Sequence, residues 1–119
     1  MTNPFKDNEK VLENEFCYAI FDGFPVSEGH MLVVPKREVP LIFDLNKDEY
    51  IGCFELVAEV KNFLQKKFNP DGFNIGINCN ASAGQTVFIA HIHIIPRYKG
   101  DVDNPRGGIR NIIPEKGDY

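Results

Sequence analysis

The sequence has no excess of positive charge and no long apolar run. Its formal net charge is −4 over 119 residues, so it has no basic field of the kind that binds nucleic-acid duplexes or anionic membranes. No stretch approaches the roughly 18 consecutive apolar residues of a membrane-spanning helix, and residues 1–10 contain no apolar signal-peptide core. We therefore expect a cytoplasmic protein without nucleic-acid duplex or membrane partners.

Cysteine is also scarce. Cys17, Cys53 and Cys79 are odd in number, lie far apart and form no C-x-x-C pair. This pattern argues against a disulfide framework and against a thiolate zinc site. We expect three free, mostly buried thiols.

What remains is the composition of an ordinary globular domain, with 43% hydrophobic and 25% charged residues. A chain of 119 residues suits one domain, which we take to span residues 1–119. Residues 98–119 are rich in glycine, proline and charge, which predicts a tail over the surface.

Apolar runs separated by turn residues predict the strands. The predicted strands cover residues 16–21, 31–34, 73–79 and 86–95. Asn46 and Glu49 form a capping-box pattern, which predicts a helix over residues 47–68 whose apolar stripe packs on the sheet. Strands grouped around one long helix indicate an α+β domain with a mainly antiparallel sheet.

The three histidines form two clusters. His30 precedes the second strand, and His91 and His93 lie inside the last one. Strand alternation points His91 and His93 to one face, about 6.5 to 7 Å apart along the chain. Taken alone, the pair is compatible with a structural polar face, with a zinc site or with phosphate chemistry. Zinc is unfavoured because a structural site needs about four protein ligands and a catalytic one about three, and only His30 is left as a third imidazole.

The loop before the histidine strand favours phosphate chemistry. Residues 80–86 read N-A-S-A-G-Q-T, where a glycine-permitted turn and the Gln85 and Thr86 side chains can donate hydrogen bonds to anionic oxygens. An ordinary turn between strands is the alternative interpretation.

Together these residues resemble the histidine triad (HIT) family. The resemblance rests on G-Q-T-V-x-x-x-H-x-H-x-x-P-R over residues 84–97 and on D-x-F-P-x-x-x-G-H-x-L-V-x-P over residues 22–35. It extends from about Phe16 to Arg97 and is closest to bacterial members of the fragile-histidine-triad and dinucleoside-polyphosphate-hydrolase type. The zinc-binding cysteines of some relatives are absent.

The resemblance implies a dimeric HIT-like fold that binds a purine nucleotide. It implies hydrolysis or transfer at the α-phosphate of a dinucleoside polyphosphate or nucleoside phosphoramidate, through a covalent nucleotidyl-His91 and without a required cofactor. A neutral imidazole is a plausible nucleophile because one ring nitrogen attacks while the other holds the proton. His93 and His30 would contact phosphate oxygens and the leaving group.

The resemblance also assigns binding residues. Asp22 would accept hydrogen bonds from the ribose hydroxyls, although judged alone it is a turn-initiating aspartate. The phosphate path would be lined by Asn78, Gln85 and Thr86, and the base pocket by Ile20, Phe21 and Phe5, each of which could otherwise be plain core.

Ile89 stands where the family usually has its first triad histidine. If that histidine mainly orients its neighbours, activity would fall without vanishing. If it is indispensable, the domain would be a catalytically silent nucleotide-binding or interaction protein. We expect an active enzyme, because the residues matched to attack and phosphate binding are all retained.

Overall fold

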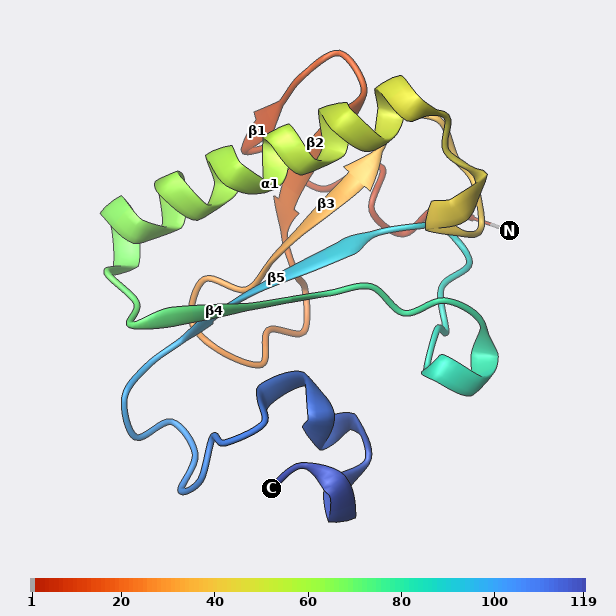
Figure 1. Cartoon of the computed structure of the whole chain (residues 1–119). Helices are drawn as coiled ribbons and strands as arrows, with labels where there is room; N and C mark the ends of the chain where they lie inside the picture. Colours follow the sequence, from red (N-terminus) through yellow and green to blue (C-terminus); the bar gives the residue numbers. More distant parts are fainter. Residues whose placement is uncertain (1) are drawn as a thin grey trace.

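The computed structural model describes residues 2–119 and is built on one antiparallel sheet (Figure 1). Every pair of neighbouring strands in it is antiparallel, as the sequence predicts. Across the sheet the strands are ordered β1 (Leu12–Glu13), β2 (Cys17–Phe21), β3 (Met31–Pro35), β5 (Ile92–Arg97) and β4 (Gly72–Gly76).

One long helix, α1 (Lys47–Phe68), covers one face of this sheet, and its bounds confirm the predicted range. Its capping box is formed: the Glu49 N–H donates to the Asn46 side chain at 2.9 Å, and the Asn46 N–H donates to the Glu49 carboxylate at 2.8 Å. The helix is capped by Asn69, whose φ of 51° is left-handed. No helix among residues 2–119 has the length and apolar character to cross a membrane.

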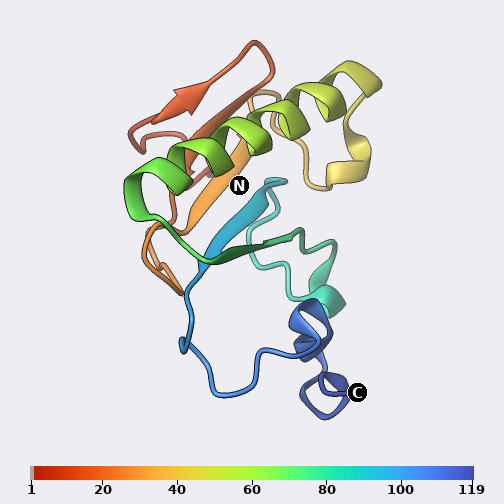
Figure 2. The same ribbon diagram turned by 60° about the vertical axis from the view of Figure 1, so that its left-hand side comes forward.

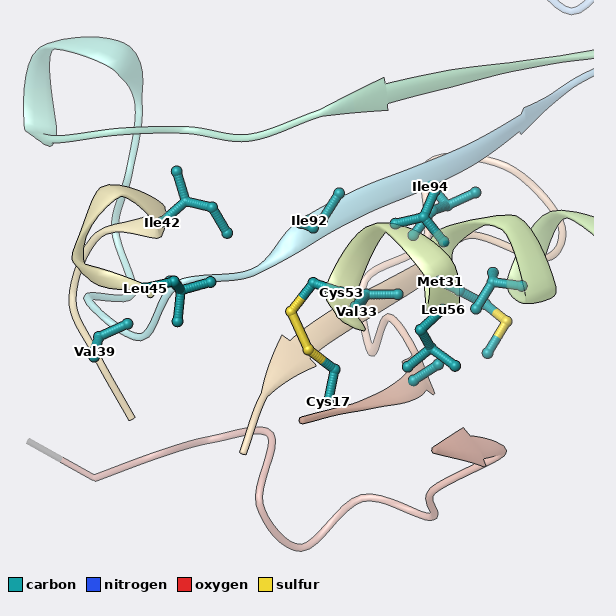
Figure 3. Packing of buried hydrophobic residues seen from close by; sticks show 14 of the residues in the cluster. Cys17, Met31, Val33, Val39, Ile42, Leu45, Cys53, Leu56, Ile92 and Ile94 are labelled. Carbon is teal, nitrogen blue, oxygen red and sulfur yellow. A yellow bond between two sulfur atoms is a disulfide. The ribbon is translucent and has the colours of Figure 1, made fainter. Parts of the chain in front are cut away.

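Side-chain alternation divides the core in two. On the α1 side, Ile92 and Ile94 of β5 pack with helix residues such as Leu56 (Figure 3). On the opposite side, a smaller buried cluster contains Ile20, Leu32 and other apolar residues, with Phe5 packed against it. The histidine pair belongs to this second face, because residues 91 and 93 alternate with the buried Ile92 and Ile94.

Four short 3-10 helices lie in the connections. They are η1 (Ile42–Asp44), η2 (Ala81–Ala83), η3 (Gly108–Ile112) and η4 (Pro114–Lys116). The C-terminal segment that holds η3 and η4 lies beyond β4, on the far side from α1 (Figures 1 and 2), and η3 contacts β4.

All four predicted strands differ slightly at their ends, and two of them differ by three residues or more. The last strand begins at Ile92 and not at residue 86, and β4 ends at Gly76 and not at residue 79. Residues 80–90 leave the sheet because their backbone bonds elsewhere; the Ala90 N–H, for example, donates to the Val39 carbonyl at 2.7 Å.

The prediction of three free thiols is wrong for two of them. Cys17 of β2 and Cys53 of α1 form a disulfide with their Cα atoms 5.6 Å apart, and Cys79 is free (Figure 3). Cysteine number and spacing could not show this, because the two residues are 36 positions apart and meet only when α1 crosses β2.

We predict that replacing Cys17 and Cys53 by alanine lowers the free energy of unfolding by about 3–4 kcal/mol, since the bond restricts the unfolded chain. Urea unfolding measures the effect, with Cys79→Ala as the matched control. Reductant should weaken the wild type but leave the double variant unchanged. Alkylation of three cysteines in denatured, unreduced protein would contradict the disulfide.

Candidate functional site

The three histidines meet on the sheet face opposite α1. His91 immediately precedes β5 and His93 lies within it, and their ring centroids are 5.1 Å apart. His30 immediately precedes β3, which pairs with β5, and its ring centroid is 5.2 Å from that of His93. The alternation prediction that His91 and His93 share one face is confirmed by this geometry.

A backbone donor sets the proton position on His30. The Val26 N–H donates to His30 Nδ1 at 3.1 Å, so neutral His30 carries its proton on Nε2. That nitrogen lies 2.9 Å from His93 Nδ1 and 3.3 Å from Asp22 Oδ2. With His30 donating to its Nδ1, neutral His93 carries its own proton on Nε2.

A backbone acceptor sets the proton position on His91. His91 Nδ1 lies 2.7 Å from the Ile89 carbonyl oxygen, so Nδ1–H donates and Nε2 keeps a free lone pair. The Phe5 ring packs edge-on against the imidazole, with the centroids 4.9 Å apart. The hydrogen bond uses only the backbone of residue 89, so it does not require a histidine side chain there.

Two of the imidazoles, those of His93 and His30, have lowered pKa values. Burial lowers the pKa of His93 to about 4, helped by the neighbouring His91 and His30 and opposed by Asp22. Burial also lowers the pKa of His30, against the opposing charge of Asp22. Both rings are therefore neutral at neutral pH, and each can donate from one nitrogen while accepting at the other.

The same cluster has the composition of a metal site. The ligand atoms of Asp22, His30 and His93 lie within 4.8 Å of one another. A histidine that binds a metal normally donates its second ring N–H to an acceptor. His30 faces the opposite arrangement, because its second nitrogen receives the Val26 N–H and its proton is held at the nitrogen that would ligate. These residues therefore fit a hydrogen-bonded cluster better than a metal centre.

Asp22 belongs to this cluster as well as to a turn. Its Oδ1 accepts the Phe24 N–H at 2.8 Å, which is the turn geometry, while Oδ2 faces His30 and lies 3.9 Å from His93 Nδ1. The sequence analysis assigned Asp22 to the ribose hydroxyls and did not predict its contact with His30. The signal lies in the β2–β3 register, in which the Asp22 N–H donates to the His30 carbonyl at 2.9 Å.

The Gln85 side chain forms hydrogen bonds with backbone groups. It is buried, its Nε2 donates to the carbonyls of Pro40 at 2.7 Å and Val87 at 3.1 Å, and its Oε1 accepts the Asn80 N–H at 2.8 Å. Both amide protons are therefore used. In this structure the Gln85 side chain holds the loop, so its predicted contact with phosphate would require these hydrogen bonds to be exchanged.

Asn78 and Thr86, the other two predicted phosphate ligands, have exposed side chains. Neither makes a side-chain hydrogen bond within residues 2–119, so their donors are available. Their contact with phosphate stays a prediction.

The three predicted base-pocket residues do not lie together. Ile20 and Phe5 belong to the cluster on the histidine side of the sheet. Phe21 lies on the α1 side, with its ring centroid 6.3 Å from that of Phe63 and 6.5 Å from that of Phe68. Assigning Phe21 to this pocket is wrong, because consecutive residues of a strand face opposite sides.

Comparison with known proteins identifies the family and the fold. A model of the HIT domain matches residues 3–100. The bis(5'-adenosyl)-triphosphatase of Dictyostelium discoideum is 38% identical over 99 residues, which cover 83% of this chain and 66% of that protein. The asymmetrical bis(5'-nucleosyl)-tetraphosphatase of Schizosaccharomyces pombe is 44% identical over 77 residues, which cover 65% of this chain and 42% of that protein. The chain thus spans less than two-thirds of the length of either relative.

Solved structures agree. A HIT family protein from Bacillus anthracis superposes with a TM-score of 0.75 at 40% identity, covering 79% of this chain and 67% of its own. A HIT family member from Bacillus subtilis gives 0.74 at 34% identity, covering 79% and 67%. The predicted HIT-like fold is confirmed, and the chain belongs to the HIT domain family.

Proposed function

We propose that this chain cleaves nucleotides at the α-phosphate, as a hydrolase or transferase, with His91 as the nucleophile. The observation that carries the proposal is the proton arrangement on the histidine face. His91 Nδ1 is tied to the Ile89 carbonyl, which leaves the lone pair of Nε2 free beside His93. Two relatives are named as hydrolases of dinucleoside polyphosphates, which supports a phosphoric anhydride as the bond cleaved.

The first step forms a bond between His91 Nε2 and the α-phosphorus and breaks the bond to the leaving group. The electron pair of that bond departs with the leaving group, whose new negative charge is stabilised by a hydrogen bond donated by His93 Nε2–H; where the leaving group needs a proton, water supplies it. His91 then carries the nucleotidyl group. Attack of water on the phosphorus releases the nucleoside monophosphate and restores His91, whereas attack by another acceptor gives transfer.

His93 and His30 act as neutral donors in this scheme. Their lowered pKa values keep them uncharged, so His93 can accept at Nδ1 and donate from Nε2 to a phosphoryl oxygen. The scheme needs no metal, in keeping with the proton position on His30. Asp22 stays our candidate for the ribose hydroxyls, since its Oδ2 lies beside His30 and its side chain is 15% exposed.

The homodimer stays a prediction. β4 is an edge strand within residues 2–119 that η3 contacts, and an edge strand of this kind is where another strand can pair. A catalytically silent protein was the alternative raised by Ile89. The backbone hydrogen bond to His91 supports the active enzyme over that alternative, because it can orient His91 without a histidine side chain at residue 89.

We predict that His91→Ala reduces AMP release from diadenosine triphosphate by at least about 1,000-fold, because the attacking atom is lost. His91→Gly should do the same while nucleotide affinity stays nearly unchanged. Initial rates by chromatography, affinity by calorimetry and folding by circular dichroism measure these effects. Turnover of either variant close to wild type would refute the nucleophile, and loss of wild-type activity on chelation would indicate a metal.

His93 should stay neutral well into the acid range. Its pKa of about 4 in the fold lies below the value of about 6.5 for unfolded histidine. The unfolded chain therefore binds the proton more readily between these values, so the stability contributed by neutral His93 is present above about pH 6.5 and lost as pH falls toward 4. NMR titration of the ring, with urea-unfolded protein as control, measures the pKa. A folded-state midpoint at or above 6 would contradict this assignment.

Ile89→Val should retain His91-dependent turnover within about threefold, with a stability loss of about 1 kcal/mol, because the carbonyl stays in place and only one methylene is removed. Val87→Ala is the matched control in the same apolar cluster. Steady-state rates and urea unfolding are the measurements. A variant that folds normally but loses activity a hundredfold would show that the Ile89 side chain itself positions the nucleophile.

A further inference from the structure

The loop of residues 23–29 joins β2 to β3 and carries the backbone donor of the histidine cluster. Val26 supplies this donor, since its N–H binds His30 Nδ1 at 3.1 Å. The loop forms neither helix nor strand, and the Val26 side chain is 72% exposed. Packing of that side chain therefore does little to fix the place of the N–H, and other contacts of the loop must hold it.

Two hydroxyl groups hold this loop against the end of β5. The Ser27 hydroxyl donates to the Pro96 carbonyl at 2.6 Å. The Tyr98 hydroxyl donates to the Glu28 carbonyl at 2.8 Å. Each bond joins the loop to a segment about seventy residues away in the sequence, so both form only when the loop and β5 lie side by side.

The Ser27 bond lies where strand pairing stops. The ladder between β3 and β5 ends at Met31 and Ile94, so residues 95–97 of β5 have no β3 partner. Pro96 is fully buried, and a buried carbonyl without a partner is costly. The Ser27 hydroxyl supplies a partner for this carbonyl, which gives the loop a defined attachment point at the sheet.

A continuous row of hydrogen bonds leads from Ser27 to the cluster. Ser27 directly follows Val26, so a fixed Ser27 also restrains the Val26 N–H. The Ser27 carbonyl accepts the His30 N–H at 3.2 Å, which closes the turn before β3. From His30 the row continues at Nε2, which lies 2.9 Å from His93 Nδ1. The hydroxyl of Ser27 is thus connected with the proton arrangement of His93.

The proton of His30 depends on this row. While the Val26 N–H occupies Nδ1, neutral His30 holds its proton at Nε2. If the N–H withdraws, Nδ1 can take the proton, and Nε2 becomes an acceptor that faces His93 Nδ1. His93 must then carry its own proton on Nδ1, which leaves a lone pair at its Nε2. A lone pair there cannot donate to a phosphoryl oxygen.

We propose that Ser27 is a positioning residue, whose hydroxyl holds the Val26 N–H in place and thereby keeps the proton of His93 on Nε2. Tyr98 holds the same loop at a second point. The effect of Ser27 on the histidine protons stands on this geometry alone, whereas its effect on turnover rests on the proposed function.

NMR of the imidazole nitrogens tests the positioning directly. The wild type should show Nε2–H on His30 and His93 and Nδ1–H on His91. Ser27→Ala removes the hydroxyl and should shift His30 and His93 toward the Nδ1–H form, with solvent exchange of the Val26 amide about tenfold faster. Ser27→Thr keeps a hydroxyl and should restore the wild-type pattern.

His91 is the control inside the same molecule, because its proton is set by the Ile89 carbonyl and not by the loop. It should stay Nδ1–H in Ser27→Ala. Unchanged protons on all three histidines of a folded Ser27→Ala protein would overturn the proposal. A change at His91 as well would also overturn it, since that result indicates general loosening of the site.

Tyr98→Phe tests the second attachment of the loop. It should shift the histidine protons in the same direction as Ser27→Ala but less, because the Ser27 bond remains. Tyr119→Phe is the matched control, since Tyr119 is an exposed tyrosine at the end of the C-terminal segment, and it should leave the protons unchanged. Equal spectra for Tyr119→Phe and Tyr98→Phe would assign the positioning to Ser27 alone.

Kinetics of the same variants separate this proposal from the proposed function. Ser27→Ala should lower kcat for AMP release from diadenosine triphosphate about tenfold with little change in KM, because His93 donates to charge that develops in the transition state. Ser27→Thr should recover the rate. A proton shift without loss of kcat would support the positioning and overturn His93 as the donor. A wild type without turnover would overturn the proposed function, while the NMR result would still decide the role of Ser27.

Discussion

Strand β5 is hydrogen-bonded on both edges, to β3 and to β4, and this double pairing fixes the side of the sheet that each of its residues faces. Ile92 and Ile94 are fully buried beneath α1, so the residues between and beside them must face the other way. A shift of one residue in the register would bury His93 against the helix and expose the two isoleucines. The burial of the core and the placement of the histidines are therefore fixed by the same register.

Two backbone groups then set which ring nitrogen of each histidine carries a proton. The Val26 N–H lies at one end of the cluster and the Ile89 carbonyl at the other, and between them they set the proton on His30, His93 and His91. The Val26 N–H binds His30 Nδ1, and His30 Nε2–H in turn binds His93 Nδ1, so the free N–H of the cluster is at His93 Nε2. The Ile89 carbonyl accepts from His91 Nδ1–H, so the free lone pair is at His91 Nε2. The same arrangement works against a metal ion at Asp22, His30 and His93, which would need the His30 proton elsewhere.

Predictions from the sequence are correct where a feature depends on local interactions and fail where it depends on contacts between distant segments. The helix over residues 47–68 and the shared face of His91 and His93 depend on capping and alternation, which are local, and both are confirmed. The Cys17–Cys53 bond and the backbone partners of Gln85 depend on contacts between segments far apart in the chain, which a single sequence does not reveal. Phe21 is different: alternation alone could have excluded it from a pocket shared with Ile20, so the information was present in the sequence.

At residue 89 it is the backbone carbonyl, and not the side chain, that makes the hydrogen bond orienting His91. A side chain at this position is 6% exposed and lies in an apolar cluster with Ile20 and Phe5, where an imidazole would need a buried polar partner to offset its desolvation. Isoleucine avoids that cost, and the carbonyl that holds His91 comes with any residue. The Phe5 ring, packed against His91 from the same cluster, adds an apolar support to the imidazole. With isoleucine at this position the packing beside His91 is apolar, and the hydrogen bond from His91 Nδ1–H to the carbonyl is present.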